Sequence, residues 1–136
     1  MKFTTCVILL TTAFSASVSA IGCYNLRGQQ IKASDLIYNS DRACKGYDGK
    51  RGAFQGTFGP GETKSVCVNI GDDRVDMQVQ NQNRGASFDL NDNDCAKELA
   101  SVVTRCQGSV AAGDSVGGEF QNAGWWFRVD PNNGNC

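Results

Sequence analysis

The residues best suited to chemistry lie near the end of the chain, in residues 124–130, which read Gly-Trp-Trp-Phe-Arg-Val-Asp. Alternate side chains of an extended strand point to opposite faces. One alternate set carries no charge, and we expect it to point into the core: Trp125, Phe127 and Val129. The other set, Trp126, Arg128 and Asp130, would then lie on the surface.

Two interpretations remain open for this surface set. The first is an ion pair between Arg128 and Asp130 beside a half-covered ring. The second is a sugar-binding site, because an aromatic ring packs against the apolar face of a pyranose while polar side chains bind its hydroxyls. Further aromatic candidates are Tyr24, Tyr38 and Tyr47, although packing is the commoner role of such residues. The candidate glycan-binding set is Trp126, Arg128, Asp130, Tyr47 and Asn122.

Most other catalytic and metal chemistry is excluded by composition. The chain has no His and no Cys-x-x-Cys pair, which excludes Ser-His-Asp and Cys-His catalysis and any His-based metal site. Residues 89–94 resemble a calcium loop but have no glycine at the sixth position, and Ala100 stands at the twelfth, where a Glu is required. A helix cap explains these residues better. We therefore expect no metal and no cofactor.

A pair of carboxylates is the remaining enzymatic option. The glutamates that could contribute are Glu62, Glu98 and Glu119. Glu62 lies in a predicted turn, and Glu98 is expected to face water on a helix. We therefore expect a protein that is not an enzyme.

The central element is a helix predicted over about residues 92–107. Its buried face is marked by residues spaced as on one side of a helix: Cys95, Leu99, Val102, Val103 and Cys106. Cys95 and Cys106 are about three turns apart on this helix, so they cannot pair with each other. Each of them must bond to another part of the chain.

A second helix is predicted over about residues 35–45, with Ser34 as its N-cap and Gly46 just after its end. Strands are predicted over residues 21–24, 53–58, 63–70, 75–80, 118–121 and 125–130. Residues 59–62, Gly-Pro-Gly-Glu, predict a type II turn that joins the second and third of these strands in a hairpin. Pro131 is expected to end the last strand. Two helices and four to six antiparallel strands indicate an α+β fold.

The first twenty residues are typical of a secretory signal peptide. Lys2 precedes a short apolar run over residues 6–14, and Val18-Ser19-Ala20 forms a small-residue cleavage site. Residues 21–136 then form a single domain in the extracellular space. Without Lys2, the 13 basic residues become 12 against 14 acidic ones, so neither nucleic acid nor membrane insertion is expected.

The predicted domain contains an even number of cysteines: Cys23, Cys44, Cys67, Cys95, Cys106 and Cys136. In a secreted chain this indicates a disulfide framework. Six cysteines allow 15 pairings, and the residues themselves exclude only those that join Cys95 to Cys106.

The order of these cysteines and of several residues around them is a pattern shared with known families. The pattern includes Asp94-Cys95, Leu99, Gly117-Gly118 and the ending Trp-Phe-Arg-Val-Asp-Pro over residues 126–131. It resembles small secreted fungal proteins grouped with a glycan-binding protein of ink-cap mushrooms. The cysteine order is also similar to that of fungal killer toxins and related effectors. That second resemblance implies an α/β sandwich with the disulfides Cys23–Cys106, Cys44–Cys95 and Cys67–Cys136.

The first resemblance implies a secreted lectin-like protein that binds cell-surface glycans, in defence or cytotoxicity. A homodimer would raise weak affinity at single sites through multivalency. The alternative is a killer-toxin-like effector that binds a protein target such as a channel or host receptor, with Lys50 and Arg51 in a projecting basic loop.

Overall fold

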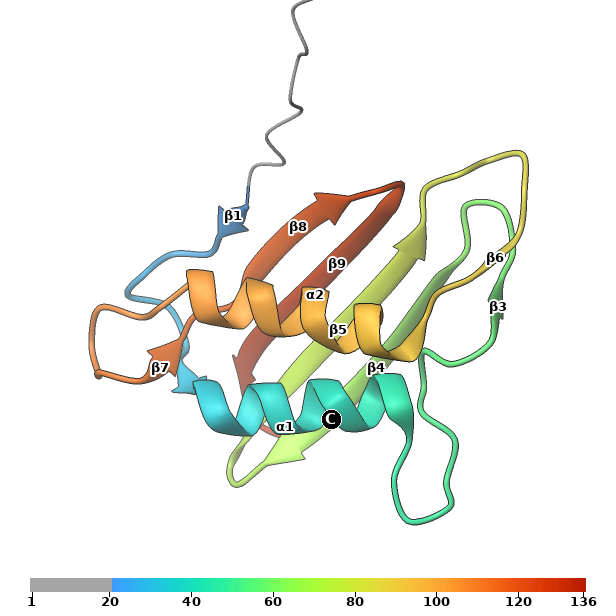
Figure 1. Ribbon diagram of the computed structural model, residues 1–136. Helices are drawn as coiled ribbons and strands as arrows, with labels where there is room; N and C mark the ends of the chain where they lie inside the picture. The colour runs from blue at the N-terminus through green and yellow to red at the C-terminus, as the bar shows by residue number, and fades with distance from the viewer. Residues whose placement is uncertain (1–20) are drawn as a thin grey trace, which may run out of the picture.

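The computed structural model describes residues 21–136, so the predicted signal peptide at residues 1–20 lies outside the described residues. The protein has two layers, an antiparallel sheet of five strands and two helices that lie side by side on one face of it (Figure 1). The predicted α+β class is therefore confirmed. The helices are α1 (Ala33–Lys45) and α2 (Asp92–Arg105).

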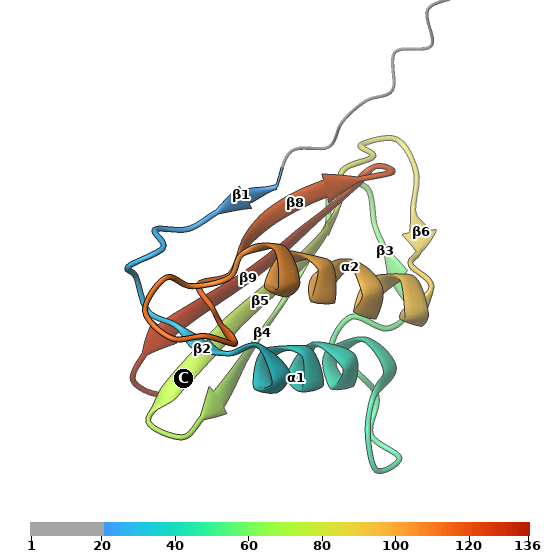
Figure 2. The ribbon, with the colours of Figure 1, turned by 60° about the vertical axis from the view of Figure 1, so that its left-hand side comes forward.

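The five-stranded sheet has the order β1-β8-β9-β5-β4, and all its neighbours are antiparallel. Its strands are β1 (Gly22–Cys23), β4 (Thr63–Ile70), β5 (Asp73–Asn81), β8 (Gly118–Asn122) and β9 (Trp125–Asn133). Two small sheets lie at its ends, one pairing β2 (Ile31–Lys32) with β7 (Asp114–Ser115), the other pairing β3 (Thr57–Phe58) with β6 (Phe88–Asp89) (Figure 2).

The core lies between the helices and the central strands β5 and β9. These two strands pair over nine residues, and their core-facing side chains lie opposite one another, as Val79 does to Phe127 and Met77 to Val129. From the helix layer, Leu36 and Leu99 meet them, and both are fully buried. Alternating apolar and polar residues in both strands explain why only one face of the sheet is buried.

The two helices begin differently. At α2, the side chain of Asn91 accepts hydrogen bonds from the backbone N–H groups of Asn93 and Asp94, as the predicted cap requires. The predicted cap at Ser34 is wrong, because α1 begins at Ala33 and has no side-chain cap. Instead, the N–H of Ala33 donates to the carbonyl of Gly113 at 2.9 Å, so a distant loop satisfies this helix end.

The predicted hairpin of residues 53–58 with 63–70 is wrong, although its turn is formed. Gly61 has φ +70°, and the N–H of Glu62 donates to the carbonyl of Gly59, as in a type II turn. However, β3 has only two residues and pairs with β6, while β4 pairs with β5. The N–H of Phe54 donates to the carbonyl of Ala43, so this segment is held by the end of α1.

Pro131 does not end the last strand, because β9 continues to Asn133. The pairing of β8 with β9 ends at Gly118, which lies opposite Val129. Beyond that point β9 has β5 as its only partner in the sheet, within the described chain. A proline costs no ladder hydrogen bond on an edge without a neighbour, so the strand can continue through it.

Three disulfides tie the layers together. They are Cys23–Cys106, Cys44–Cys95 and Cys67–Cys136, the pairing implied by the resemblance to killer toxins. Cys44–Cys95 joins α1 to α2 in the core, Cys23–Cys106 joins β1 to the end of α2, and Cys67–Cys136 joins β4 to the C-terminal residue.

Candidate functional site

The face of the sheet that the helices leave uncovered carries mostly polar side chains, and we call it the open face. It is defined by residues of β5, β8 and β9: Arg74, Asp76, Gln78, Gln80, Glu119, Gln121, Trp126, Arg128, Asp130 and Asn132. Strand alternation places these residues opposite the buried set, since Phe127 and Val129 are buried in the core. Trp125 also points inward and packs edge-on against Phe58, with ring centroids 5.0 Å apart. The predicted inward set is therefore confirmed.

Trp126 is a half-buried indole among amide side chains on the open face. In the register of the sheet, Gln80 of β5 lies opposite it on one side and Gln121 of β8 on the other. Directly opposed residues of neighbouring strands lie close enough for their side chains to interact. Trp126 is therefore flanked on both sides by groups that can donate and accept hydrogen bonds.

Arg128 is held by three residues on the open face. Its Nε donates to the Tyr24 hydroxyl at 2.7 Å, Nη1 donates to Oε1 of Gln78 at 3.3 Å, and Nη2 forms an ion pair with Asp130. The predicted Arg128–Asp130 pair is therefore present. Because Tyr24, Gln78 and Asp130 come from three segments, the guanidinium position is fixed independently of any ligand.

These contacts shift two pKa values. Burial raises the pKa of the Tyr24 hydroxyl, and the hydrogen bond from Arg128 offsets only part of that rise. For Arg128, burial alone would lower the pKa of the guanidinium, but the hydrogen bond to Tyr24 and the charge of Asp130 outweigh burial and raise it. Both groups keep their protons at neutral pH, so Arg128 is a permanent cation and Tyr24 a neutral hydroxyl.

Asp76 and Asp130 form a second feature of the open face, which sequence reasoning missed. They lie directly opposite each other on β5 and β9. Two like charges so placed repel, but each has its own compensation. Asp76 accepts from Arg74 and Asn132, both at 3.1 Å, and Asp130 accepts from Arg128. The alternation of residues 75–80 indicated a polar face, but the register that opposes the two aspartates is not visible in the sequence.

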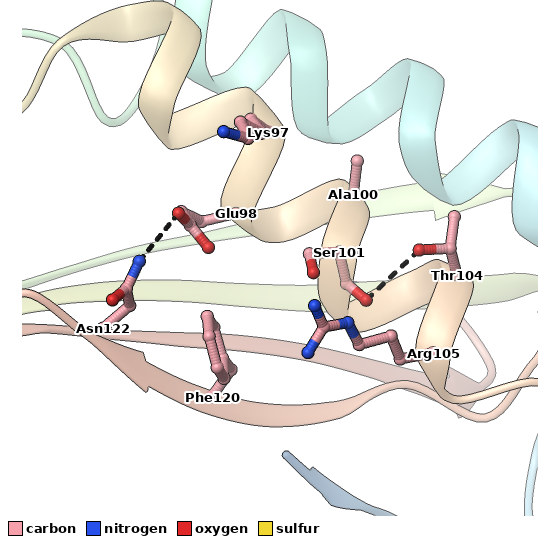
Figure 3. A pocket seen from close by; sticks show the side chains of 8 residues that line it. All are labelled: Lys97, Glu98, Ala100, Ser101, Thr104, Arg105, Phe120 and Asn122. Atoms are coloured by element: carbon pink, nitrogen blue, oxygen red, sulfur yellow. Dashed lines mark hydrogen bonds between the residues drawn. The ribbon is translucent and has the colours of Figure 1, made fainter. Parts of the chain in front are cut away.

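The structure does not bring Tyr47 and Asn122 to the open face. Tyr47 lies in the loop after α1, where the guanidinium carbon of Arg42 is 3.6 Å from its ring centroid. Asn122 occupies the helix-facing side of β8, and its Nδ2 donates to Oε1 of Glu98 at 3.0 Å (Figure 3). Three of the five predicted contacts, Trp126, Arg128 and Asp130, thus share one surface.

Asn122 and Glu98 lie in a groove between α2 and β8, which has a volume of about 740 Å³. Phe120 forms part of its floor, and the guanidinium of Arg105 lies above that ring, 6.0 Å from the centroid (Figure 3). Among the described residues that line the groove, Glu98 supplies the one carboxylate. A glycosidase needs two carboxylates about 5–9 Å apart, so this groove does not provide them.

Over residues 21–136, no group of three or more His, Cys, Asp or Glu side chains could hold a metal ion. In the same part of the chain, no helix has the length and apolar character needed to cross a bilayer. Three disulfides in one small domain are typical of an oxidising or extracellular compartment.

No protein-family model matches the chain, and no curated protein matches it.

Proposed function

We propose that the protein is a secreted, non-enzymatic lectin that binds cell-surface glycans on the open face of its sheet. The supporting observation is a half-buried indole, Trp126, that lies between two glutamines and beside a fixed guanidinium. Sugars combine an apolar C–H face with a ring of hydroxyls. An indole with amide, guanidinium and carboxylate neighbours is complementary to both features.

Each side chain has a distinct role in this proposal. The Trp126 ring packs against the apolar face of one sugar unit, while Gln80 and Gln121 bind its hydroxyls from either side. Arg128 and Asp130 lie further along β9 and bind the next unit. Trp126 and Asp130 are four residues apart, about 14 Å along a strand, which is longer than one pyranose.

Preorganisation favours binding here. Arg128 is already held by Tyr24, Gln78 and Asp130, so little rotamer entropy is lost when a ligand binds. A single shallow site of this kind binds weakly. A homodimer that presents two such faces would raise the effective affinity for a glycan-covered surface without new contacts.

Secretion is part of the proposal. It is supported by the signal-like residues at the start of the sequence and by the three disulfides that the fold contains.

A glycan array tests the proposal. The disulfide-bonded wild type should bind a restricted set of glycans, and Trp126→Ala should lose that binding while its circular dichroism spectrum is unchanged. Tyr38→Ala is the matched control, because it removes an exposed aromatic ring from α1, on the opposite layer, and should bind as the wild type does. A folded wild type that binds no glycan, or a Trp126→Ala variant that binds normally, would contradict the proposal.

A further inference from the structure

The sheet has one long edge that is unpaired in the described chain. β4 pairs with β5 through all eight of its residues, and none of the other strands in residues 21–136 lies beside it. The C-terminal residue is attached to side chains of this strand, by the disulfide to Cys67 and a hydrogen bond to Asn69, rather than to its backbone. An antiparallel edge strand leaves a row of backbone N–H and C=O groups free to pair with another strand.

A groove of about 500 Å³ runs beside this edge, and we call it the edge groove. It is bounded by β4, the last turns of α1 and the loop that follows α1. Its apolar part comes from Val66, Val68, Ala43 and Ala53. Side chains on the inner face of an added strand would enter this groove beneath α1.

The rim of the edge groove is cationic, although the whole chain carries a net charge of −1. Arg42 and Arg51 line the groove, and Lys50 precedes Arg51 in the loop. Within residues 21–136, none of these three has a carboxylate within ion-pair distance. Nearby Lys45 is instead neutralised by Asp41.

The rim cations are positioned by their surroundings rather than left free. Arg42 lies over the ring of Tyr47 and hydrogen-bonds to the hydroxyl of Tyr38, and Arg51 donates to the carbonyl of Gln55 at 3.0 Å. Such fixed cations lose little entropy when they bind an anion. They offer carboxylates a binding site next to an unpaired strand.

We propose that the β4 edge is a docking site for an extended acidic segment of a partner protein, which adds to the sheet as a further antiparallel strand. Backbone hydrogen bonds to β4 hold the segment, small apolar side chains enter the edge groove, and acidic side chains pair with Arg42 and Arg51. This surface is separate from the open face, so the proposal does not depend on glycan binding.

Charge argues for this occupant over a second copy of the chain. Two β4 strands paired edge to edge would each contribute Lys64, and both cationic rims would approach one another. Lys64 also points toward the core side, where its Nζ binds the carbonyls of Gln55 and Gly56. Because like charges on paired strands repel and opposite charges attract, Lys64 disfavours a second β4 as the added strand but not an acidic one.

The test is a titration of the isotope-labelled, disulfide-bonded protein, followed by NMR, with a capped ten-residue peptide that we call the Glu-Val peptide. Every second residue of this peptide is Glu or Val in turn, with Ser between them, so that Glu and Val lie on the same face of the added strand. Shifts should concentrate on residues 66–69 and on the loop that carries Arg51. The matched Lys-Val peptide should bind about tenfold more weakly or worse, because its charges repel the rim. N-methylation along one edge of the Glu-Val peptide should abolish binding, and along the other edge should leave it unchanged.

The variant Arg42→Glu, Arg51→Glu should lose binding of the Glu-Val peptide, while Arg84→Glu, on a distant loop, should not. Trp126→Ala should also bind the peptide normally, so failure here is distinguishable from failure of the glycan proposal. The proposal would be overturned by no binding, by shifts centred on the open face, by equal binding of both peptides, or by insensitivity to N-methylation. It would also be overturned by a stable dimer whose β4 amides are already protected from exchange.

Discussion

At the scale of single residues, Arg128 connects three segments of the chain on the open face. It binds Tyr24 from beyond β1, Gln78 from β5 and Asp130 from its own strand, so it ties the N-terminal segment to the centre of the sheet. The interaction with Tyr24 joins residues 104 positions apart. Its strength depends on the protonation state of the Tyr24 hydroxyl.

The raised pKa of Tyr24 predicts a loss of stability at high pH. Because burial raises the pKa of Tyr24 above its ordinary value of 10.0, its neutral hydroxyl stabilises the fold fully below that pH. This contribution is lost as the pH rises through the folded-state pKa. Denaturant unfolding at increasing pH should show Tyr24→Phe losing less stability than the wild type. An absorbance titration in which Tyr24 ionises at or below pH 10 would contradict this prediction.

The buried side-chain amide of Asn81 is expected to contribute strongly to the free energy of unfolding. It is 1% exposed, and its Nδ2 lies within hydrogen-bond distance of the carbonyls of Phe58, Gly59 and Ala86. Asn81→Leu would remove this side-chain donor from the buried carbonyl of Phe58 and the partly buried carbonyls of Gly59 and Ala86, at a cost of about 3 kcal/mol in the free energy of unfolding. Chemical denaturation measures it, with Gln82→Ala as a neighbouring control that should stay within about 0.5 kcal/mol of the wild type.

At the scale of elements, the two helices differ in how much of their stability is local. Asn91 caps α2 through its own side chain, so Asn91→Ala should lower the free energy of unfolding by about 1 kcal/mol. Asn91→Asp should keep most of that stability, since an aspartate also caps and its charge suits the helix dipole.

Ser34→Ala is the control for that helix prediction. The structure gives Ser34 no capping role, so its removal should change the stability by less than about 0.5 kcal/mol. Equal losses at the two positions, measured by denaturant unfolding, would show that the capping bonds of Asn91 do not stabilise α2.

Elements defined by local chemistry could be predicted from the sequence. The stripe from Cys95 to Val103 predicted α2, and the alternation of Val75, Met77 and Val79 predicted the core of β5. The turn at residues 59–62 was also predicted, because Pro followed by Gly favours it in isolation. Partners that lie far apart in sequence could not be predicted, since β3 pairs with β6 about thirty residues away.

The same distinction holds for the candidate site. Alternation along β9 put Trp126, Arg128 and Asp130 on one face, and this part of the prediction is confirmed. Asn122 is the last residue of the preceding strand, β8, and strand alternation places its side chain on the helix-facing side, where it binds Glu98. The guanidinium of Arg42 lies over the ring of Tyr47, which a sequence cannot show. Tyr24 reaches Arg128 only because β1 pairs with β8.

At the scale of the whole molecule, each of the three disulfides joins a different pair of segments. Cys44–Cys95 is buried and joins the two helices, whereas both partners of Cys67–Cys136 are exposed and fasten the last residue to the sheet edge. The loops they close, with sequence separations of 51 and 69, are similar in length. In the chain-entropy model each bridge contributes about 4 kcal/mol, so loop length does not separate them.

The two bridges are expected to differ in their contribution to stability because of packing. The double variant Cys44→Ala, Cys95→Ala also leaves a cavity between α1 and α2, which adds about 2 kcal/mol to the loss. The double variant Cys67→Ala, Cys136→Ala leaves no cavity in the core, so its melting temperature should fall less. Calorimetry of both variants beside the wild type shows which loses more of its melting temperature. Hydrogen exchange shows which region is destabilised: exchange should be faster in both helices of the first variant and near β4 in the second. An equal or larger loss from the tail bridge would mean that anchoring the C-terminus, rather than clamping the helices, governs the stability of the fold.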